Sequence, residues 1–516
     1  MSQDQKPPLL LRPAMHPAVK DFLADQKQVS QLVRALGSPL NIMFPHLVGE
    51  NLKAFADTMR KHQVLGRVFF AHKTTRSDSL VKQMAVEKVS LDVASLNELK
   101  HALACGFDGS RLEATGPKHR DFIALCLMHS VTLNIDSLAE LKQAIAIHQG
   151  LGIERRPGIE QRPGIEQRLG IEQRPGIKRE TKVLIRLSGF GDASTAALRK
   201  SSRFGVPLNE LESLFTLLEE HQDFSLLGFS FHLDTQSQQE RVAAIEKCLS
   251  LFDEAISRGF SPQVLNIGGG FRVNYLEHEH DWSNYVAAIK ESVLGQRAPI
   301  TWQNQSFGLS ASGGALKGNF NSYNFHEPLP GAKFLDEILS QPLASMGDAT
   351  VGQILSNNMI ELWIEPGRAL VDQCGLTVAL VNAIRQGSEG EQLVALNMKR
   401  SDLAFLDQEY FVDPVILYKK PPEAQTSPAL PVYFTGNLCL ESDLILRHAT
   451  FVAKVPEVAD LLVFVNTAGY AMDFSASNAL MQPPALKVAV TRKSKEHIWV
   501  LDENYSPVSS FLDEEV

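Results

Sequence analysis

The stretch VFFAHKTTRSD, from Val68 to Asp78, ends an apolar run with a charged side chain. Val68 to Ala71 has the character of a buried strand, and Lys73 follows with no turn residue in between. A lysine beside apolar surface usually extends to water. A lysine that acts as an amine nucleophile is instead held where its pKa is lowered. The position of Lys73 therefore indicates a catalytic lysine, provided that other strands end in groups that can act with it.

Short apolar runs alternate with amphipathic helical patterns about eight times between Asn41 and Arg368. Such strand–helix units predict a (β/α)8 TIM-like barrel, with a doubly wound sheet as the alternative. After Arg368 strand patterns follow one another without long helices, which predicts a second, β-rich domain. We expect residues 1–40 to join that domain, 41–370 to form the barrel and 371–516 to complete the β-rich domain.

Two segments interrupt the barrel pattern. Residues 151–180 repeat a six-residue unit, as in PGIEQR, about five times. Its period fits neither helix nor strand, and added length in a surface loop costs little closure entropy, so we expect an insert that packs on nothing. A longer insert covers about residues 272–360 and contains many Gly, Asn, Ser and aromatic residues. It leaves a barrel strand end, so it is expected either to form a lid or wall of the site for a larger, more polar substrate, with Trp302 and its Asn and Tyr groups as contacts, or to be a surface excursion.

Composition excludes several classes of protein. The net charge of -9 and the pI near 6.0 argue against binding to nucleic acid or to anionic membranes. No apolar run reaches the roughly 18 residues that span a bilayer, and the first residues show no signal-peptide pattern. The five cysteines form no CxxC pair, which favours a reducing cytoplasm. The cluster EHEHDW at Glu277 has metal-binding residue types, but we expect no metal site there.

Further strand ends supply partners for Lys73. LNIGGGF runs into Gly268, Gly269 and Gly270, whose bare amides can form a nest for phosphate. IEPGRAL offers Glu365 and Arg368, and SFHLDTQ offers His232 with Thr235 close by. A lysine, a phosphate nest, an arginine and a carboxylate at barrel strand ends suggest pyridoxal 5'-phosphate (PLP).

These segments, in this order, resemble the fold-type III PLP decarboxylases, the family of ornithine and diaminopimelate decarboxylases. The resemblance covers about Ser38 to Val490, apart from the two inserts. Each motif alone is modest, but eight occur in the family's order. They are FFAHKTT, LDVASLNEL, LRKSSRFG, SFHLDTQ, LNIGGGF, IEPGRAL, TGNLCLESD and NTAGYAM.

The resemblance implies a role for each matched residue. Lys73 carries the cofactor as an imine, and His232 stacks on its ring. Glu365 pairs with the pyridine nitrogen. Cys439 protonates the carbanion left by CO₂ loss, from a loop that reaches the partner subunit of a head-to-tail homodimer. The phosphate and the rest of the cofactor are expected to contact Thr235, Gly268, Gly269, Gly270, Arg368 and Tyr470, together with Asp92 and Arg199.

Three departures from the family pattern bear on the substrate. Leu440 stands where relatives carry Asp or Glu against the distal end of the substrate, and Glu441 and Asp443 are the nearest carboxylates that could replace it in that role. Asp234 and Asn266 replace the usual Gly and Asp of two motifs. The third departure is the long insert. We therefore expect decarboxylation of an amino acid or amino-acid conjugate without a free distal amine, such as a siderophore or other secondary-metabolite intermediate.

Two other functions remain open at this level. An amino-acid racemase can use the same fold, but racemases of this kind place Arg at the pyridine nitrogen, where this chain has Glu365. A non-catalytic regulator can also retain the fold, although the presence of Lys73, Arg368 and Tyr470 argues against that role.

Overall fold

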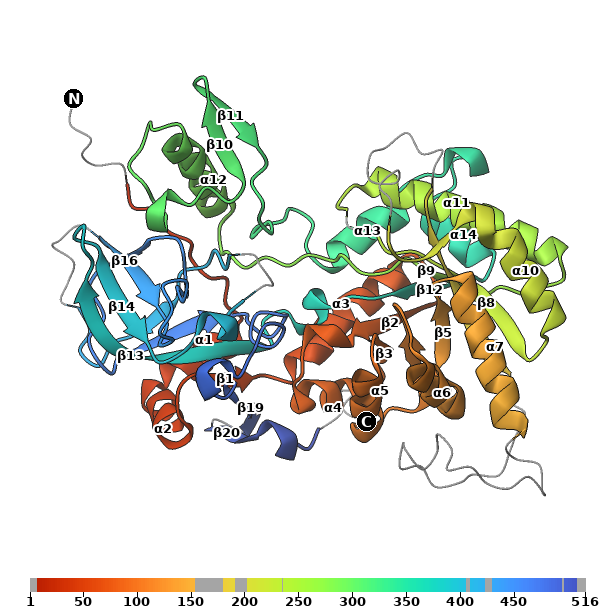
Figure 1. Cartoon of the computed structure of the whole chain (residues 1–516), viewed down its shortest axis with the longest axis horizontal. Coiled ribbons are helices and arrows are strands. Elements are labelled where there is room, and N and C mark those ends of the chain that lie inside the picture. The colour runs from red at the N-terminus through yellow and green to blue at the C-terminus, as the bar shows by residue number, and fades with distance from the viewer. Residues whose placement is uncertain are drawn as a thin grey trace.

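The computed structural model describes residues 7–153, 180–190, 202–233, 235–404, 409–422, 429–493 and 496–507. Figure 1 shows two domains side by side: a barrel ringed by helices and a sheet domain that holds the C-terminal strands. Most of the hexad repeat, residues 154–179, lies outside the described residues, as do Arg199 and Asp234.

The first domain is a closed parallel barrel, as predicted. Each strand pairs in parallel with the next, and pairing between β5 and β6 closes the ring, which excludes the doubly wound alternative. The apolar run at Val68 becomes the buried end of a strand because parallel barrel strands are covered on both faces. The barrel strands are β2 (Gly66–Ala71), β3 (Ser90–Val93), β4 (Leu112–Ala114), β5 (Thr132–Ile135), β6 (Thr181–Ser188), β8 (Phe224–Ser230), β9 (Val264–Asn266) and β12 (Glu361–Ile364), and the short β7 (Val206–Pro207) pairs with β6 outside the ring.

Helices surround the barrel, and several of them begin at a polar side-chain cap. The Ser77 side chain accepts a hydrogen bond from the N–H of Leu80, and the Ser95 side chain accepts one from that of Glu98. Such caps satisfy free N–H groups and fix where the chain turns from strand end to helix. The helices are α3 (Leu47–Lys61), α4 (Asp78–Val86), α5 (Leu96–Ala104), α6 (Arg120–His129), α7 (Leu138–Ile153), α10 (Leu211–Glu220), α11 (Gln238–Ser257), α13 (Ala332–Ser340) and α14 (Val351–Asn357).

The second domain is mostly sheet and combines both ends of the chain. β1 (Leu40–Met43) pairs antiparallel with β13 and parallel with β19, so the N-terminal contribution to this sheet continues to Met43. Two helices, α1 (Pro17–Ala24) and α2 (Gln26–Leu36), precede β1. The other strands are β13 (Gly375–Gln386), β14 (Gln392–Leu396), β15 (Val415–Leu417), β16 (Leu430–Thr435), β17 (Thr450–Val452), β18 (Leu461–Val465), β19 (Leu486–Lys493) and β20 (Glu496–Leu501).

The long insert divides between the two domains. Its first part, with α12 (Glu279–Val293) and the hairpin of β10 (Leu309–Ser312) and β11 (Ala315–Gly318), lies beside the sheet domain (Figure 1). Its second part supplies α13 and α14, and α13 packs on α3 and α11 of the barrel. Phe411 of the sheet domain anchors the first part within an aromatic cluster of Trp282, Tyr285, Phe307, Phe320 and Phe325.

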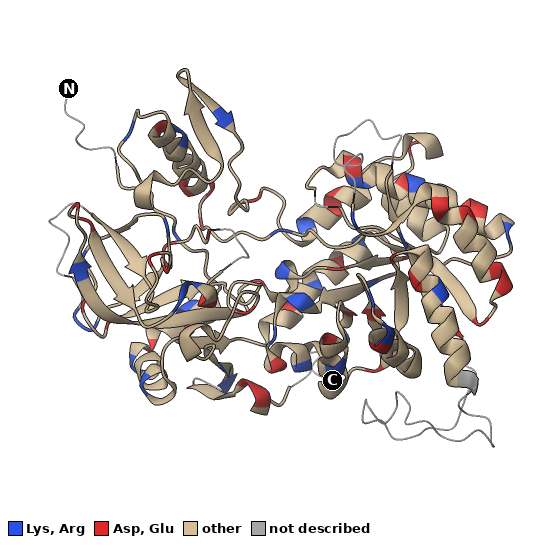
Figure 2. Ribbon diagram, viewed as in Figure 1, with Lys and Arg blue, Asp and Glu red and all other residues tan. Residues whose placement is uncertain are grey.

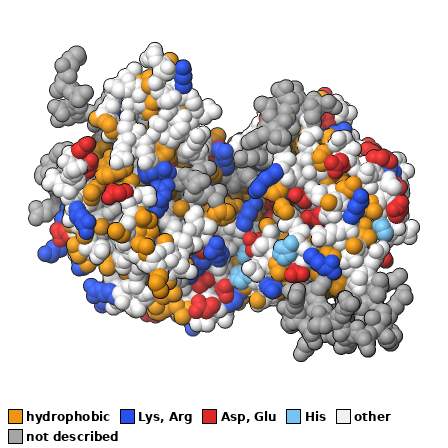
Figure 3. All heavy atoms as spheres, in the orientation of Figure 1, with side chains coloured by type: hydrophobic (Ala, Val, Ile, Leu, Met, Phe, Trp, Pro, Cys, Tyr) orange, Lys and Arg blue, Asp and Glu red, His pale blue; other side chains and the backbone are white. Residues whose placement is uncertain are grey.

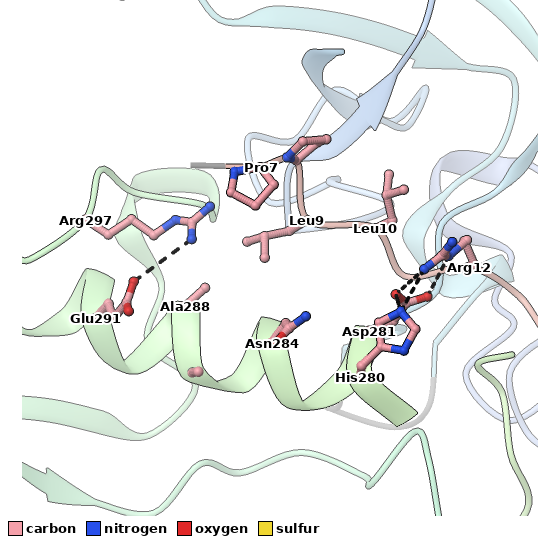
Figure 4. A pocket seen from close by; sticks show the side chains of 12 residues that line it. Pro7, Leu9, Leu10, Arg12, His280, Asp281, Asn284, Ala288, Glu291 and Arg297 are labelled. Carbon is pink, nitrogen blue, oxygen red and sulfur yellow. Dashed lines mark hydrogen bonds and ion pairs between the residues drawn. The ribbon is translucent and has the colours of Figure 1, made fainter. Parts of the chain in front are cut away.

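The N-terminal segment crosses the first part of the insert. Arg12 forms an ion pair with Asp281 at 2.7 Å, and Pro13 forms a β-bridge with Leu276. A cavity of about 400 Å³ lies between residues 7–12 and α12, where Figure 4 shows the Arg12–Asp281 pair at one end and Glu291 with Arg297 at the other. None of the residues predicted for the active site lines this cavity.

Charge is spread over both domains. Figure 2 shows acidic and basic residues on the barrel helices and the sheet domain alike, and the face in Figure 3 mixes both signs with apolar side chains. In the part of the chain that the structure describes, no helix is long and apolar enough to cross a membrane. Within those same residues, no cluster of three or more His, Cys, Asp or Glu side chains is arranged to hold a metal ion.

Candidate active site

Lys73 lies at the carboxyl end of β2, in the short helix η1 (His72–Thr74). Its side chain is accessible to solvent, whereas His72 and Thr74 are buried. Enclosure by the strand ends, the largest influence, lowers the pKa of Lys73, but Tyr470, Asp92 and Glu365 together raise it above its ordinary value. The expectation of a lowered pKa is therefore wrong for this arrangement. The surrounding acids hold Lys73 as an ammonium group.

Two predicted carboxylates face Lys73 from neighbouring strands. Asp92, in β3, is buried and accepts a hydrogen bond from the Thr115 hydroxyl. Glu365 follows β12, and its side chain is 11% exposed. Burial first, and then Asp92, raise the pKa of Glu365 to about 7. β2 lies between β3 and β12 in the barrel, so its register sets these groups on either side of Lys73.

His232 follows β8 and lies against the same carboxylate. Its Nδ1 is 3.9 Å from Oε2 of Glu365 and accepts a hydrogen bond of 3.1 Å from the N–H of Gly269. Enclosure, followed by Lys73, lowers the pKa of His232 to about 3, so the imidazole is neutral near pH 7. The structure thus brings together Lys73, Asp92, His232, Glu365 and Tyr470, which we call the Lys73 cluster.

The glycine loop, Gly268 to Gly270, passes close to this cluster. A Cβ on Gly268 would lie 2.6 Å from the carbonyl oxygen of Phe231, and one on Gly269 would lie 2.6 Å from that of Glu365. Gly268 and Gly270 also adopt φ of +69° and +91°, which favour glycine. No other residue type lets the backbone approach His232 and Glu365 this closely.

Arg241, which the sequence analysis missed, supports the glycine loop from beneath. It lies on α11, is fully buried, and donates hydrogen bonds to the backbone carbonyls of Leu233, Thr235, Ile267 and Gly269. A buried guanidinium beneath this loop adds positive charge beside the proposed phosphate nest. Its sequence context, one arginine in an amphipathic helix, gives no signal of this contact.

Arg368 meets the long insert at the other side of the site. Its Nη1 donates a 2.6 Å hydrogen bond to the Tyr275 hydroxyl, and its guanidinium lies 4.4 Å and 5.0 Å from the ring centroids of Tyr323 and Tyr470. The insert therefore reaches a predicted site residue through two tyrosines. Trp302, also expected as a contact, instead packs on Tyr433 of the sheet domain.

Thr235 lies near the glycine loop, but its hydroxyl is hydrogen-bonded to the carboxylate of Glu240. Its backbone carbonyl accepts from Arg241. The sequence analysis also missed Arg186, on β6. Its Nη1 lies 3.6 Å from Oδ1 of Asp136, and its positive charge lowers the pKa of both Lys73 and Glu365.

The Cys439 loop, residues 436–443, is separate from the Lys73 cluster, whose members lie close to one another. Cys439, Leu440 and Glu441 are exposed, with Leu440 at 55%. Asp443 is buried, and its carboxylate accepts hydrogen bonds from the N–H groups of Leu438 and Arg400, both at 2.8 Å. Among the described residues, no hydrogen bond, ion pair or ring contact joins this loop to the Lys73 cluster.

The barrel groups fit PLP. The glycine loop has no side-chain bulk, but the N–H groups of Gly268 and Gly269 already donate to Asn266 and His232. The Thr74 hydroxyl is buried with no hydrogen-bond partner in the described part of the chain. An amine, an acid for a ring nitrogen and a flat neutral imidazole lie beside that loop. This donor set matches an aldehyde, a pyridine ring and a phosphate within one ligand.

Comparisons with known proteins agree with this chemistry. The family model described as "Pyridoxal-dependent decarboxylase, pyridoxal binding domain" matches residues 47–305. The diaminopimelate decarboxylase of Bacillus subtilis is 24% identical over 498 residues, covering 92% of each chain. An uncharacterised protein of Sinorhizobium fredii, y4yA, is 27% identical over 440 residues, covering 85% of this chain and 84% of its own.

A solved structure shares the fold. The diaminopimelate decarboxylase of Helicobacter pylori, solved in complex with L-lysine, aligns with a TM-score of 0.63 at 16% identity. The alignment covers 91% of this chain and 95% of that chain.

Proposed function

The chain belongs to the pyridoxal-dependent decarboxylases, and from this premise we propose that it removes the α-carboxyl group from an amino acid, or from the amino-acid part of a conjugate, that lacks a free distal amine. Its class is that of the PLP-dependent carboxy-lyases, with PLP as cofactor and an amino acid as substrate. The observation that carries the proposal is the convergence of Lys73, His232 and Glu365 on the glycine loop at one end of the barrel.

In this proposal the barrel residues hold the cofactor. Lys73 would attach it through Nζ, His232 would contact its ring, and Glu365 would accept a hydrogen bond from the pyridine nitrogen. PLP supplies an electron sink for the electron pair left when CO₂ departs. The phosphate group is assigned to the glycine loop and to its neighbours Thr235, Arg368 and Tyr470. Asp92 and Arg199 are retained as cofactor contacts by the family resemblance.

The Cys439 loop is assigned to the partner subunit's site in a homodimer. Its Cys439 and Leu440 side chains are exposed on a single chain, as expected of groups that a second chain covers. The Cys439 thiol then donates a proton to the substrate Cα after CO₂ loss.

The proposed substrate depends on which acidic side chains of the Cys439 loop could pair with an ammonium group. The Asp443 carboxylate is engaged by two backbone N–H groups, so it is not available to a substrate ammonium. Leu440 cannot pair with an ammonium, and an unpaired buried ammonium costs several kcal/mol. Glu441, which is exposed, is the remaining acid of the loop. The leucine at position 440, where relatives carry an acid, disfavours diaminopimelate, lysine and ornithine as substrates.

A substrate panel tests the function. Purified protein with PLP is incubated with lysine, ornithine and diaminopimelate, and with acyl- or citrate-linked amino acids, while CO₂ release is measured. We expect the highest kcat/KM for a compound whose distal nitrogen is absent or acylated. Turnover of a free diamino acid at about 10⁴ M⁻¹s⁻¹ or above refutes the substrate proposal. A lack of CO₂ release from every α-amino acid tested would refute decarboxylation itself.

A further inference from the structure

Glu113 is a fully buried acid that none of the sequence motifs contains. It lies in β4 and is 0% exposed. Its Oε1 accepts a hydrogen bond of 2.6 Å from Nδ2 of Asn134 on β5. Nδ2 of Asn266, on β9, lies 3.1 Å and 3.0 Å from its two carboxyl oxygens. The acid is therefore held by two neutral amides.

Asn266 connects Glu113 to Glu365. Its Oδ1 accepts a 2.8 Å hydrogen bond from the N–H of Gly268, which turns its Nδ2 toward the two acids. That nitrogen also lies 2.8 Å from Oε1 of Glu365. A single side-chain amide thus links two carboxyl groups and the glycine loop. Asn134 is fixed in the same way, because its Oδ1 accepts from the Ser230 hydroxyl at 2.7 Å.

The two carboxyl groups differ in their surroundings. Glu365 has Lys73, Arg186 and His232 nearby, and burial with Asp92 raises its pKa to about 7. Burial, followed by the charges of Glu365 and Asp92, raises the pKa of Glu113 well above its ordinary value. Among the described residues, the hydrogen bonds to the Glu113 carboxyl oxygens come from the amide N–H groups of Asn134 and Asn266, so Glu113 acts as the acceptor that fixes these amides.

We propose that Glu113 is a positioning residue: its carboxyl oxygens hold the Asn266 amide in place, and that amide in turn orients the carboxyl group of Glu365. This inference rests on the proposed function, in which Glu365 faces the pyridine nitrogen. It also explains the departure at position 266. An aspartate there, as in relatives, would set a third acid beside Glu113 and Glu365, whereas asparagine supplies the N–H that joins them.

Variants test the positioning role. Glu113→Met keeps the length of the side chain but cannot hydrogen-bond to Asn266, so we expect PLP affinity to fall by about tenfold and the pH titration of the cofactor's visible band to shift. Glu113→Gln, which keeps a group able to accept a hydrogen bond, should recover most of both losses. If Glu113→Gln is as impaired as Glu113→Met, or Glu113→Met shifts neither quantity, the proposal fails.

A double variant tests the link to Asn266. Asn266→Asp should weaken PLP binding, and adding Glu113→Gln should restore part of it, because the amide introduced at position 113 donates to the new carboxylate. Purely additive effects contradict the link.

Borohydride labelling separates this proposal from the proposed function. Cofactor fixed to Lys73 without the expected coupling rejects only the role of Glu113, whereas label on another residue rejects the site assignment.

Discussion

The Lys73 cluster and the Cys439 loop differ in how much of their chemistry one chain completes. At the barrel end, acid, imidazole and glycine loop are in contact, with Nδ1 of His232 3.1 Å from the backbone nitrogen of Gly269. In the Cys439 loop, Asp443 holds the backbone, and the side chains expected to meet substrate are exposed to solvent. Under the proposed function, one chain would suffice to bind the cofactor, whereas substrate selection and protonation would need a second chain.

Loss of Lys73 gives the largest expected effect. Lys73→Ala removes the amine that attaches the cofactor, so we expect turnover to fall by several orders of magnitude and borohydride to fix no cofactor to the chain. Lys73→Arg, which keeps the charge, serves as the control and should be equally inactive. Substantial CO₂ release by either variant contradicts the role of Lys73.

Loss of Cys439 should affect protonation and leave cofactor binding intact. We expect Cys439→Ala to retain the visible absorbance of bound PLP while formation of the correct product falls by about 10²–10⁴-fold, the usual range for a general acid. Side transamination should increase. Mass spectrometry of products and of cofactor measures both. Clean product at the wild-type rate would remove Cys439 from the mechanism.

The substitution Leu440→Asp probes the missing distal acid. If the loop lines the partner's site, an aspartate there supplies a counter-charge, and kcat/KM for ornithine should rise by about tenfold, as for one ion pair gained. Leu440→Asn is the matched control without charge. A loss of ornithine turnover in Leu440→Asp relative to Leu440→Asn contradicts the assignment.

The pKa of Glu365 predicts a pH-dependent stability. It is raised from 4.5 to about 7 by burial and by Asp92. The protonated form therefore favours the folded state: this stability is present below pH 4.5 and is lost as pH rises through about 7. Glu365→Gln does not titrate, so its melting temperature relative to wild type should rise by a few degrees between pH 5 and pH 7.5. The measurement uses protein freed of PLP. A flat difference contradicts the raised pKa.

The hexad repeat should give the smallest effect. Deleting residues 157–174 removes three units without core periodicity, so we expect melting temperature and turnover to change little. Calorimetry and the CO₂ assay measure both. A loss of folding or of dimerisation would show that the repeat packs against the rest of the protein.

The sequence predicted the barrel because its strands and helices are contiguous segments with clear periods. It also predicted that Lys73, His232, Glu365 and the glycine loop would lie near one another, because each ends a parallel strand, and parallel strand ends meet at one edge. It missed Arg241 and Glu113. Their partners lie far away in the chain, Asn266 being 153 residues from Glu113, and no local pattern marks such a contact. The division of the long insert between two domains was missed for the same reason.

Subunit complementation tests the composite site most directly. Lys73→Ala and Cys439→Ala chains are each nearly inactive in this account, but a mixed dimer contains one site with both residues intact. Co-refolded or co-expressed in equal amounts, they should recover about one quarter of wild-type activity, since about half of the dimers are mixed and each has one intact site. Recovery near that level supports a site shared between chains. Activity that stays at the level of the separate variants, although mixed dimers have formed, contradicts it.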